Sequence, residues 1–170
     1  MIKFITHKTP MLIKNVILIS LFLACGASSA TEAGIFKGRK YVVLSTSEGK
    51  EIQTVLAISE KNKNQGLSGI KKKSFKKNHA MLFHYKKDGM RKFWMPNTYF
   101  DLDIFFLDAK LEVKYVERNV PHHPGFSEPP AIYRTKVYFS RHVLEMRSDS
   151  DLARKIKPGH KLNLKKGFFP

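Results

Sequence analysis

Three acidic residues stand where the sequence could place proton-transfer chemistry. Asp101 and Asp103 are two positions apart at the start of an apolar run, so in a strand both carboxylates point to the same face. Phe105 follows on that face, and partial desolvation raises a carboxyl pKa toward the range useful for acid–base catalysis. Glu145 lies in a second apolar run and faces either a pocket or solvent. Asp103 and Glu145, with Asp101 as a third candidate, are therefore the predicted catalytic acids if the protein is an enzyme.

A structural role for Asp103 is the alternative. Buried carboxylates must find hydrogen-bond donors, and the turn at Asn97 and Thr98 could supply them. The sequence contains no glycine-rich phosphate loop, no nucleophile elbow and no zinc-protease helix. These observations favour a non-enzymatic binding or structural module. A small hydrolase or isomerase that uses Asp103 and Glu145 remains the alternative.

A second candidate site is a short block of aromatic, thioether and polar residues: Trp94, Met95, Asn97 and Thr98. A ring supplies contact area and the amide and hydroxyl supply direction, which suits a small molecule or a sugar. The alternative is that these large side chains only fill the core. We predict ligand binding at this block.

Histidines and the single cysteine do not form a metal site in the sequence. His122 and His123 are adjacent and point in different directions if extended, and no Asp, Glu or Cys stands at ligand spacing around them. One cysteine excludes a zinc site built on several thiolates. We therefore predict neither a metal nor a cofactor.

The chain is strongly basic, with 31 Lys and Arg against 14 Asp and Glu and a net charge of +17. Nine basic residues crowd one region: Lys71, Lys72, Lys73, Lys76, Lys77, Lys86, Lys87, Arg91 and Lys92. Such a cluster could bind a polyanion through counterion release. No RNA-recognition or helix-turn-helix pattern surrounds it, so anionic envelope polymers or lipids are better partners than nucleic acid. The alternative is a solvated cationic surface.

Residues 1–30 are predicted to be an export signal. Lys3, Lys8 and Lys14 precede an apolar run over 16–24, which is about half the roughly 20 residues that a membrane-spanning helix needs. Cleavage after Ala30 would give a periplasmic or secreted protein. Cleavage before Cys25 would give a lipoprotein anchored in the cell envelope. Membrane contact is expected only through the signal or this lipid, and loss of the three lysines leaves a net charge of +14.

Residues 31–170 are predicted to form a single β-rich domain, present as a monomer. The chain is 42% hydrophobic, which is sufficient for a core. Short apolar runs separated by turn residues predict strands, which we list by number: 41–44, 52–58, 81–85, 92–95, 102–107, 111–116, 132–139, 142–146 and 161–164. Ser148 is the expected N-cap of a helix over 149–156, and residues 60–77 are expected to hold one short helix or turn. We expect a compact antiparallel sandwich or barrel-like sheet with one or two short helices.

The ordered blocks resemble the domain of unknown function 192 family. The blocks that match are Gly66-Leu67, 81–83, Phe93 to Thr98, 102–106, 143–145 and 157–160. The resemblance covers about residues 40 to 165 and implies a compact, mainly β fold without an established activity. The chain departs from the family pattern at Ser68, where Met is usual, at Asp101, where Pro is usual, and in a longer segment over 119–139.

Overall fold

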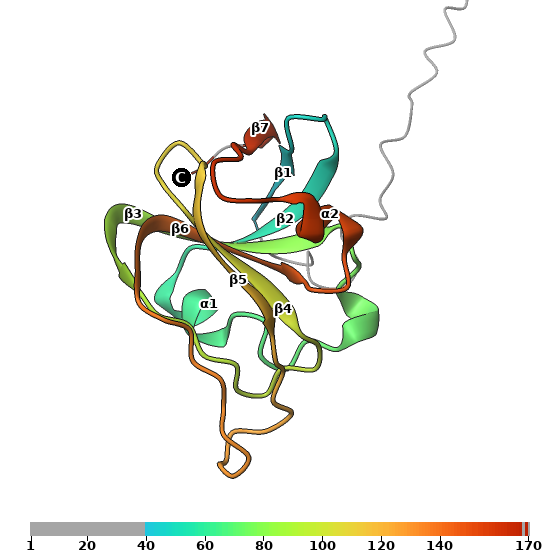
Figure 1. Cartoon of the computed structure of the whole chain (residues 1–170), viewed down its shortest axis with the longest axis vertical. Helices are drawn as coiled ribbons and strands as arrows, with labels where there is room; N and C mark the ends of the chain where they lie inside the picture. The colour runs from blue at the N-terminus through green and yellow to red at the C-terminus, as the bar shows by residue number, and fades with distance from the viewer. Residues whose placement is uncertain (1–39, 168, 170) are drawn as a thin grey trace, which may run out of the picture.

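The computed structural model of the chain describes residues 40–167 and residue 169 (Figure 1). The predicted export signal, Cys25 and both cleavage positions lie outside the described residues. Within residues 40–167, no helix has the length and apolar character needed to cross a bilayer.

The described part of the chain is built around one seven-stranded sheet with the strand order β5-β4-β6-β3-β2-β1-β7 (Figure 1). Its strands are β1 (Tyr41–Ser45), β2 (Glu51–Ala57), β3 (His79–Arg91), β4 (Leu102–Leu107), β5 (Val113–Val120), β6 (Tyr138–Arg147) and β7 (Asn163–Lys166). The prediction of a mainly β domain is confirmed. The strands form a single mixed sheet that does not close into a barrel.

Strands β2 and β3 are the parallel pair in a sheet whose other neighbours are antiparallel. Parallel neighbours need a long crossover. The polar stretch after β2 provides it, with helix α1 (Glu60–Gln65) and the short 3-10 helix η3 (Lys72–Ser74). Ser59 caps α1 by accepting the Asn62 N–H, and Gly66, at φ 50°, ends it. A crossover of this length makes the sheet mixed instead of wholly antiparallel.

Strand β6 lies in the middle of the sheet and separates two apolar layers. Val143 points to one face, here called the Val143 face, and Leu144 points to the other, the Leu144 face. The Leu144 face is covered by helix α2 (Asp151–Lys155) and the residues after it, including Leu162. The Val143 face is covered by connecting segments, including Leu67, Phe75, Met95, Phe100 and Ile132. Every residue of β6 from His142 to Arg147 is consequently buried.

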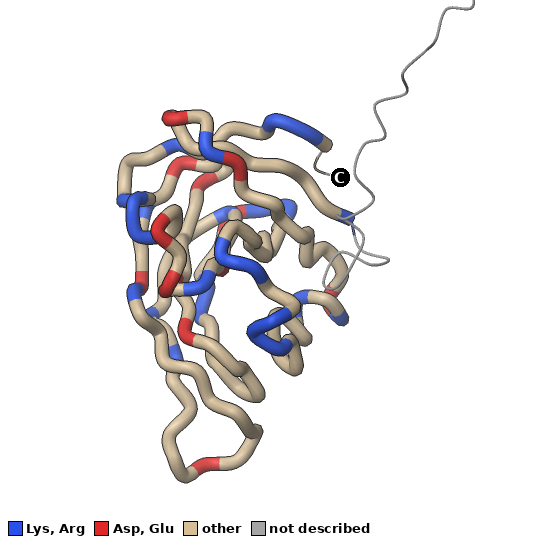
Figure 2. The backbone as a smooth tube through the Cα atoms, turned by 90° about the vertical axis from the view of Figure 1, so that its right-hand side faces the viewer, with Lys and Arg blue, Asp and Glu red and all other residues tan. Residues whose placement is uncertain are grey.

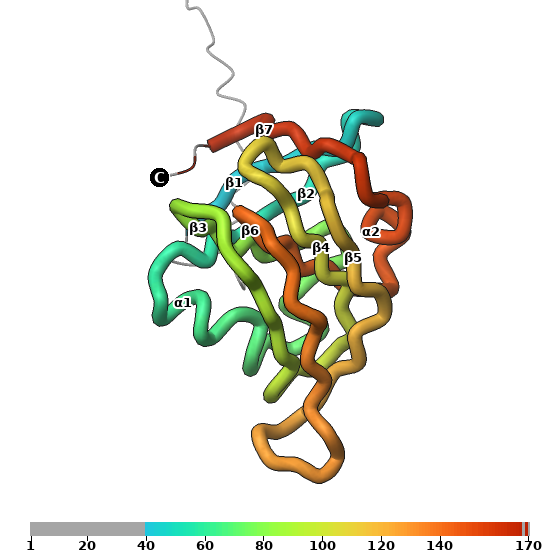
Figure 3. Tube along the Cα trace, turned by 60° about the vertical axis from the view of Figure 1, so that its left-hand side comes forward, coloured from blue at the N-terminus to red at the C-terminus, as the bar shows by residue number. Residues whose placement is uncertain are grey.

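The ribbon of β3 and β6 bends back over the Val143 face. Its register shifts between His84 and Gly89, and Figures 1 and 3 show both strands curving beyond this point. The bend brings Phe93 onto Phe83, with ring centroids 4.7 Å apart. The strand predicted over 92–95 is reduced to one bridge, from Trp94 to Arg134, and of the strand predicted over 132–139 only the last two residues join β6.

The N-cap of α2 is Ser150, so the prediction of Ser148 was wrong. The Ser150 hydroxyl accepts the Ala153 N–H at 3.3 Å. Ser148 instead donates its own N–H to the Asp101 carbonyl, 3.0 Å away. This bond keeps Ser148 paired with the loop before β4, and the helix begins three residues later.

Candidate functional site

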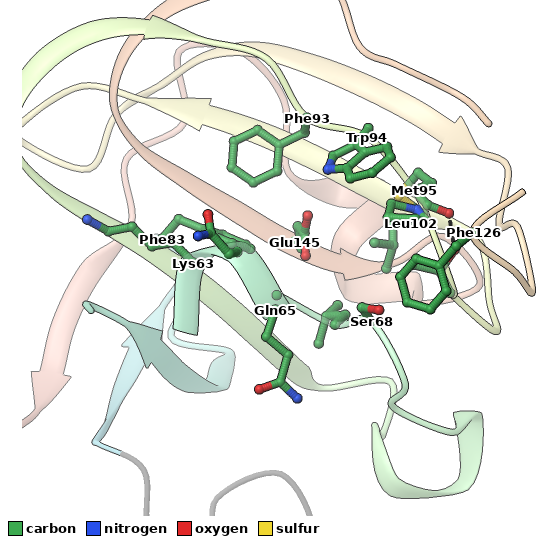
Figure 4. Close-up of a pocket in the computed structure, with 15 residues that line it drawn as sticks. Lys63, Gln65, Ser68, Phe83, Phe93, Trp94, Met95, Leu102, Phe126 and Glu145 are labelled. Atoms are coloured by element: carbon green, nitrogen blue, oxygen red, sulfur yellow. Dashed lines mark hydrogen bonds between the residues drawn. The ribbon is translucent and has the colours of Figure 1, made fainter. Parts of the chain in front are cut away.

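A cavity of about 140 Å³ lies between the Val143 face and the segments that cover it (Figure 4). One wall is the C-terminal end of α1 with the following residues 66–68. The opposite wall is the bent-back segment Phe93 to Pro96, and the floor contains Glu145 from β6 and Leu102 from β4. Phe126 reaches in from the proline-rich loop between β5 and β6. Segments from several parts of the sequence thus enclose one small cavity.

Glu145 is the central polar group of this cavity. It lies opposite Met81 in β3 and Ile104 in β4, and it is 4% exposed. None of the residues in the described part of the chain donates a hydrogen bond to its carboxyl group. Burial raises the Glu145 pKa from 4.5 to about 8. At neutral pH the group is therefore a carboxylic acid with one free O–H donor and one free carbonyl acceptor.

The nearest cations at the mouth of the cavity are already paired. The Lys63 ammonium lies 3.0 Å from a Glu60 carboxylate oxygen and 4.4 Å from the centre of the Tyr85 ring. The Arg91 guanidinium stacks on the same ring at 3.7 Å. Burial is the main reason that the Tyr85 pKa is raised. These contacts hold both cations on Tyr85 and leave Glu145 unpaired.

Aromatic and thioether side chains form most of the remaining surface. Phe83 and Phe93 meet edge to face, and Met95 is buried beside them. Trp94 is 52% exposed and Phe126 is 66% exposed, so both rings lie at the mouth. An apolar cavity with a few polar groups is the usual form of a small-molecule site.

Three of the four predicted ligand-binding residues line the cavity: Trp94, Met95 and Thr98. The Thr98 hydroxyl is used internally, because it donates to the Met95 carbonyl and accepts the His123 N–H, each at 3.0 Å. Asn97 does not line the cavity. With φ at 51°, it forms the turn after the aromatic wall, and its side-chain oxygen accepts the Tyr99 hydroxyl.

Asp103 and Glu145 do not meet. Asp103 is paired in register with Met146, which places its carboxylate on the Leu144 face, across the sheet from Glu145. It accepts the Arg118 guanidinium at 2.6 Å and the Asn119 N–H at 3.0 Å. The predicted pair of catalytic acids is therefore wrong, and so is the alternative that the Asn97 and Thr98 turn holds Asp103.

Asp101, the third candidate acid, is exposed and belongs to a loop contact. One of its carboxylate oxygens lies 2.9 Å from the His122 N–H and 2.6 Å from the ring Nδ1 of the same histidine. His123 is buried and its ring lies between the carbonyls of Gly125 and Pro130. The described residues contain no group of three or more His, Cys, Asp or Glu placed to hold a metal ion.

The nine predicted patch residues lie in two stretches of the sequence, one before β3 and one that covers the second half of β3 and the residue after it. Those from Lys71 to Lys77 precede β3, whereas Lys86 and Lys87 lie beyond its straight part, His79 to His84, which spans about 16 Å. Figure 2 shows Lys and Arg segments spread along much of the backbone. Lys72 is 3.5 Å from an Asp149 carboxylate, so part of this charge is already neutralised.

Two parts of the cavity are not predicted from the sequence, the wall at Gly66 to Ser68 and the ring of Phe126. Gly66-Leu67 carries the family resemblance but no pattern that indicates a binding site, and Phe126 lies in a loop with no periodic pattern. A turn glycine followed by a buried leucine was the available signal for the first wall. No local signal indicated that Phe126 reaches the cavity.

The fold and the cavity define a small mainly β domain with one enclosed carboxyl group. The chain belongs to the DUF192 family, described as an uncharacterised ACR, whose model matches residues 42–164. No curated protein matches the chain.

Two solved structures are similar to this fold. A proposed transcription regulator from Sinorhizobium meliloti 1021 is 26% identical, with a TM-score of 0.59, and the match covers 74% of this chain and 93% of that one. A protein of unknown function from Novosphingobium aromaticivorans DSM 12444 is 23% identical, with a TM-score of 0.60 and coverage of 81% and 99%. The second likeness concerns the fold alone.

Proposed function

We propose that this domain binds a small molecule, without chemical conversion, in the cavity above Glu145. The observation that carries the proposal is the Glu145 carboxyl group, which is buried, faces the cavity and has no hydrogen-bond partner among the described residues. Leaving such a group unpaired costs about 1–3 kcal/mol. An apolar residue at this position would avoid that cost if the face served only as a core. A ligand that pairs with the carboxyl offsets it.

The cavity volume sets the size of the ligand. It measures about 140 Å³, close to the roughly 150 Å³ of an apolar protein cavity that holds one benzene molecule. The enclosed part of the ligand is therefore about one six-membered ring. A nucleotide or an oligosaccharide could place only one small group inside.

A binding function fits the site better than catalysis does. Catalysis by acids needs a second acid, a nucleophile or an electrophile close to the first group. Asp103 lies across the sheet, and the Thr98 hydroxyl is used within its own loop. Glu145 is the only carboxyl group among the residues that line the cavity.

We further propose that the protein is exported and acts in the cell envelope or outside the cell. The basic, then apolar, then small-residue order of residues 1–30 supports this proposal. Binding of an anionic envelope polymer or lipid has weaker support, because the basic residues lie in two separate stretches, one before β3 and one in its second half. DNA binding through a helix in the major groove has little support as well. The two α-helices, α1 and α2, have only six and five residues.

Export is tested by expressing residues 1–170 in bacterial cells and measuring the intact mass of the protein that is isolated from them. A mass starting at Thr31, or a lipid-modified mass starting at Cys25, is expected. A full-length mass that still includes residues 1–30 would contradict export.

Small-molecule binding is tested with the fluorescence of Trp94, the only tryptophan of the chain and a residue of the cavity mouth. A library of ring-sized fragments is titrated, and hits are expected to change the emission and to saturate. In Ser68→Met a larger side chain fills part of the cavity, and fragment binding should weaken about tenfold or more. Ser47→Met makes the same change at an exposed turn and should leave binding unchanged. Absence of any saturable hit, or equal binding in both variants, would refute the proposal.

A further inference from the structure

We infer that the ligand of the Glu145 cavity is uncharged and presents an amide-type pair of groups, an N–H beside a C=O, to the carboxyl of Glu145. This inference rests on the proposed function and specifies the chemical class of the ligand. It follows from three features of the site: the hydrogen-bonding pattern of the carboxyl group, the charges around it and the nature of the walls.

The hydrogen-bonding pattern comes first. A protonated carboxyl group carries one O–H donor and one carbonyl acceptor side by side in one plane. A primary amide or a lactam carries the complementary pair, so both bonds form at once. A ligand carboxylate could accept the O–H but would place its second oxygen against the Glu145 carbonyl oxygen. A ligand ammonium would need Glu145 to be ionised.

The charges around Glu145 favour a neutral ligand. On α1 the titratable groups are Glu60, Lys61 and Lys63; Lys63 pairs with Glu60, and Lys61 is exposed and does not line the cavity. Among the titratable groups of β3, Tyr85 and Arg91 stack on each other, and the His79 ring packs edge to face on Phe75. From the neighbouring strand β4, Asp103 lies on the opposite face of the sheet.

The segments that cover the cavity add no further charge. The lining residues between Phe93 and Thr98, and Phe126 from the loop, carry no titratable side chain. Among the residues that line the cavity, no unpaired cation is therefore available to bind an anionic ligand. At neutral pH the Glu145 carboxyl group is not an anion that could pair with a cationic ligand, because its pKa is about 8.

The walls indicate that the rest of the ligand is apolar. Phe93, Trp94, Met95, Leu102 and Phe126 face the space around Glu145 (Figure 4). Any further polar group of the ligand would lose its hydration there without gaining a partner. The exception is the mouth, where Ser68 presents a hydroxyl group beside the exposed polar side chains of α1. The ligand class is therefore a small ring or short apolar body with an amide or lactam head.

The experiment uses three probes that share a phenyl ring and differ in head-group charge: benzamide, benzoate and benzylammonium. Trp94 fluorescence gives a Kd for each at pH 7. Benzamide is expected to bind about tenfold or more tightly than either charged probe, because only its head group leaves neither an unpaired polar atom nor an unpaired charge. For wild type, the Kd of benzamide should rise about tenfold between pH 7 and pH 9 as Glu145 ionises.

Two variants separate hydrogen bonding from packing. Glu145→Gln keeps a hydrogen-bond donor beside an acceptor, so its Kd for benzamide at pH 7 should lie within about threefold of that of wild type. Because glutamine does not titrate, this Kd should not increase between pH 7 and pH 9. Glu145→Leu keeps the bulk but no polar group and should weaken benzamide about tenfold or more. A Glu145→Leu variant that binds benzamide as wild type does would overturn the inference.

The charged probes make failure of the inference distinguishable from failure of the proposed function. Tightest binding of benzylammonium, with affinity that increases with pH, would show that Glu145 acts as an anion. Tightest binding of benzoate would show an anion site. Either result overturns the inference but leaves small-molecule binding intact. If none of the three probes binds but library fragments do, the inferred ligand class is wrong and small-molecule binding still stands. If neither the probes nor the fragments bind, both proposals fail.

Discussion

Glu145→Gln should stabilise the protein at neutral pH, although it alters a central residue of the site. Burial raises the Glu145 pKa from 4.5 to about 8. Between these values the unfolded chain has lost the proton and the folded chain retains it, so the free energy of unfolding falls as pH rises. One pKa unit corresponds to about 1.4 kcal/mol, and the 2.5 units between 4.5 and pH 7 give a loss of about 3 kcal/mol. Glutamine does not titrate and escapes this loss.

The assay is urea unfolding of wild type and Glu145→Gln at pH 4, 5.5, 7 and 8.5. The difference between the two proteins is the quantity to follow, because it cancels the contributions of His79 and His142, whose pKa values burial lowers to about 4. The difference should be near zero at pH 4, about 3 kcal/mol in favour of the variant at pH 7, and should level off at about 5 kcal/mol above about pH 9. Glu48→Gln, at an exposed turn, is the matched control and should show no such trend.

One result would refute the reasoning about this site. If Glu145→Gln is less stable than wild type at pH 7, or if the difference does not change between pH 4 and pH 7, Glu145 is ionised and paired in the folded protein. The cavity would then not present a carboxylic acid to a ligand. Both the proposed binding site and the inferred ligand class would lose their main support.

Three further substitutions test other parts of the structure. Arg118→Ala removes the guanidinium that pairs with the Asp103 carboxylate, which is 2% exposed. Urea unfolding should show a loss of about 3 kcal/mol in the free energy of unfolding, while benzamide binding stays unchanged. A variant as stable as wild type would show that the ion pair is dispensable. Gly66→Ala places a Cβ 3.2 Å from the Phe83 ring at φ 50°, so thermal unfolding should show a loss of about 1–2 kcal/mol, and an unchanged Tm would contradict the strain. Burial lowers the His142 pKa to about 4, so wild type loses stability as pH falls from 6.5. His142→Phe should reduce that loss in acid unfolding, and an identical pH profile would contradict it.

Much of the secondary structure was predictable from local patterns. The apolar residues of β2 indicated a strand, and the turn before it contains Gly49 with φ at 77°, although Thr54 to Ala57 are all buried and the strand does not alternate as a half-buried strand would. Residues 102–107 were predicted as a strand with the bounds that β4 has. Trp94, Met95 and Thr98, which the sequence analysis selected as a ligand-binding block, line the cavity. These features depend on residues within about ten positions of one another.

The pairing of distant segments was not predictable in the same way. Asp103 and Glu145 each looked like a candidate acid within its own strand. The register of β4 on β6 placed them on opposite faces, because Asp103 is paired with Met146 and not with Glu145. A shift of one residue in that register would have brought the two side chains to the same face.

The sequence by itself determined a mainly β domain, a strongly basic composition and a carboxyl group in an apolar strand. Alternation along β6 requires Glu145 to point away from Leu144 and Met146, but it does not say whether water, protein or a cavity lies there. Only the tertiary structure decided this, through the crossover by α1, the bend of the β3 and β6 ribbon and the loop that carries Phe126. Those segments are far apart in sequence, and their meeting depends on non-local packing. That packing removes water from Glu145, and the loss of water makes it an acid that stays protonated at neutral pH.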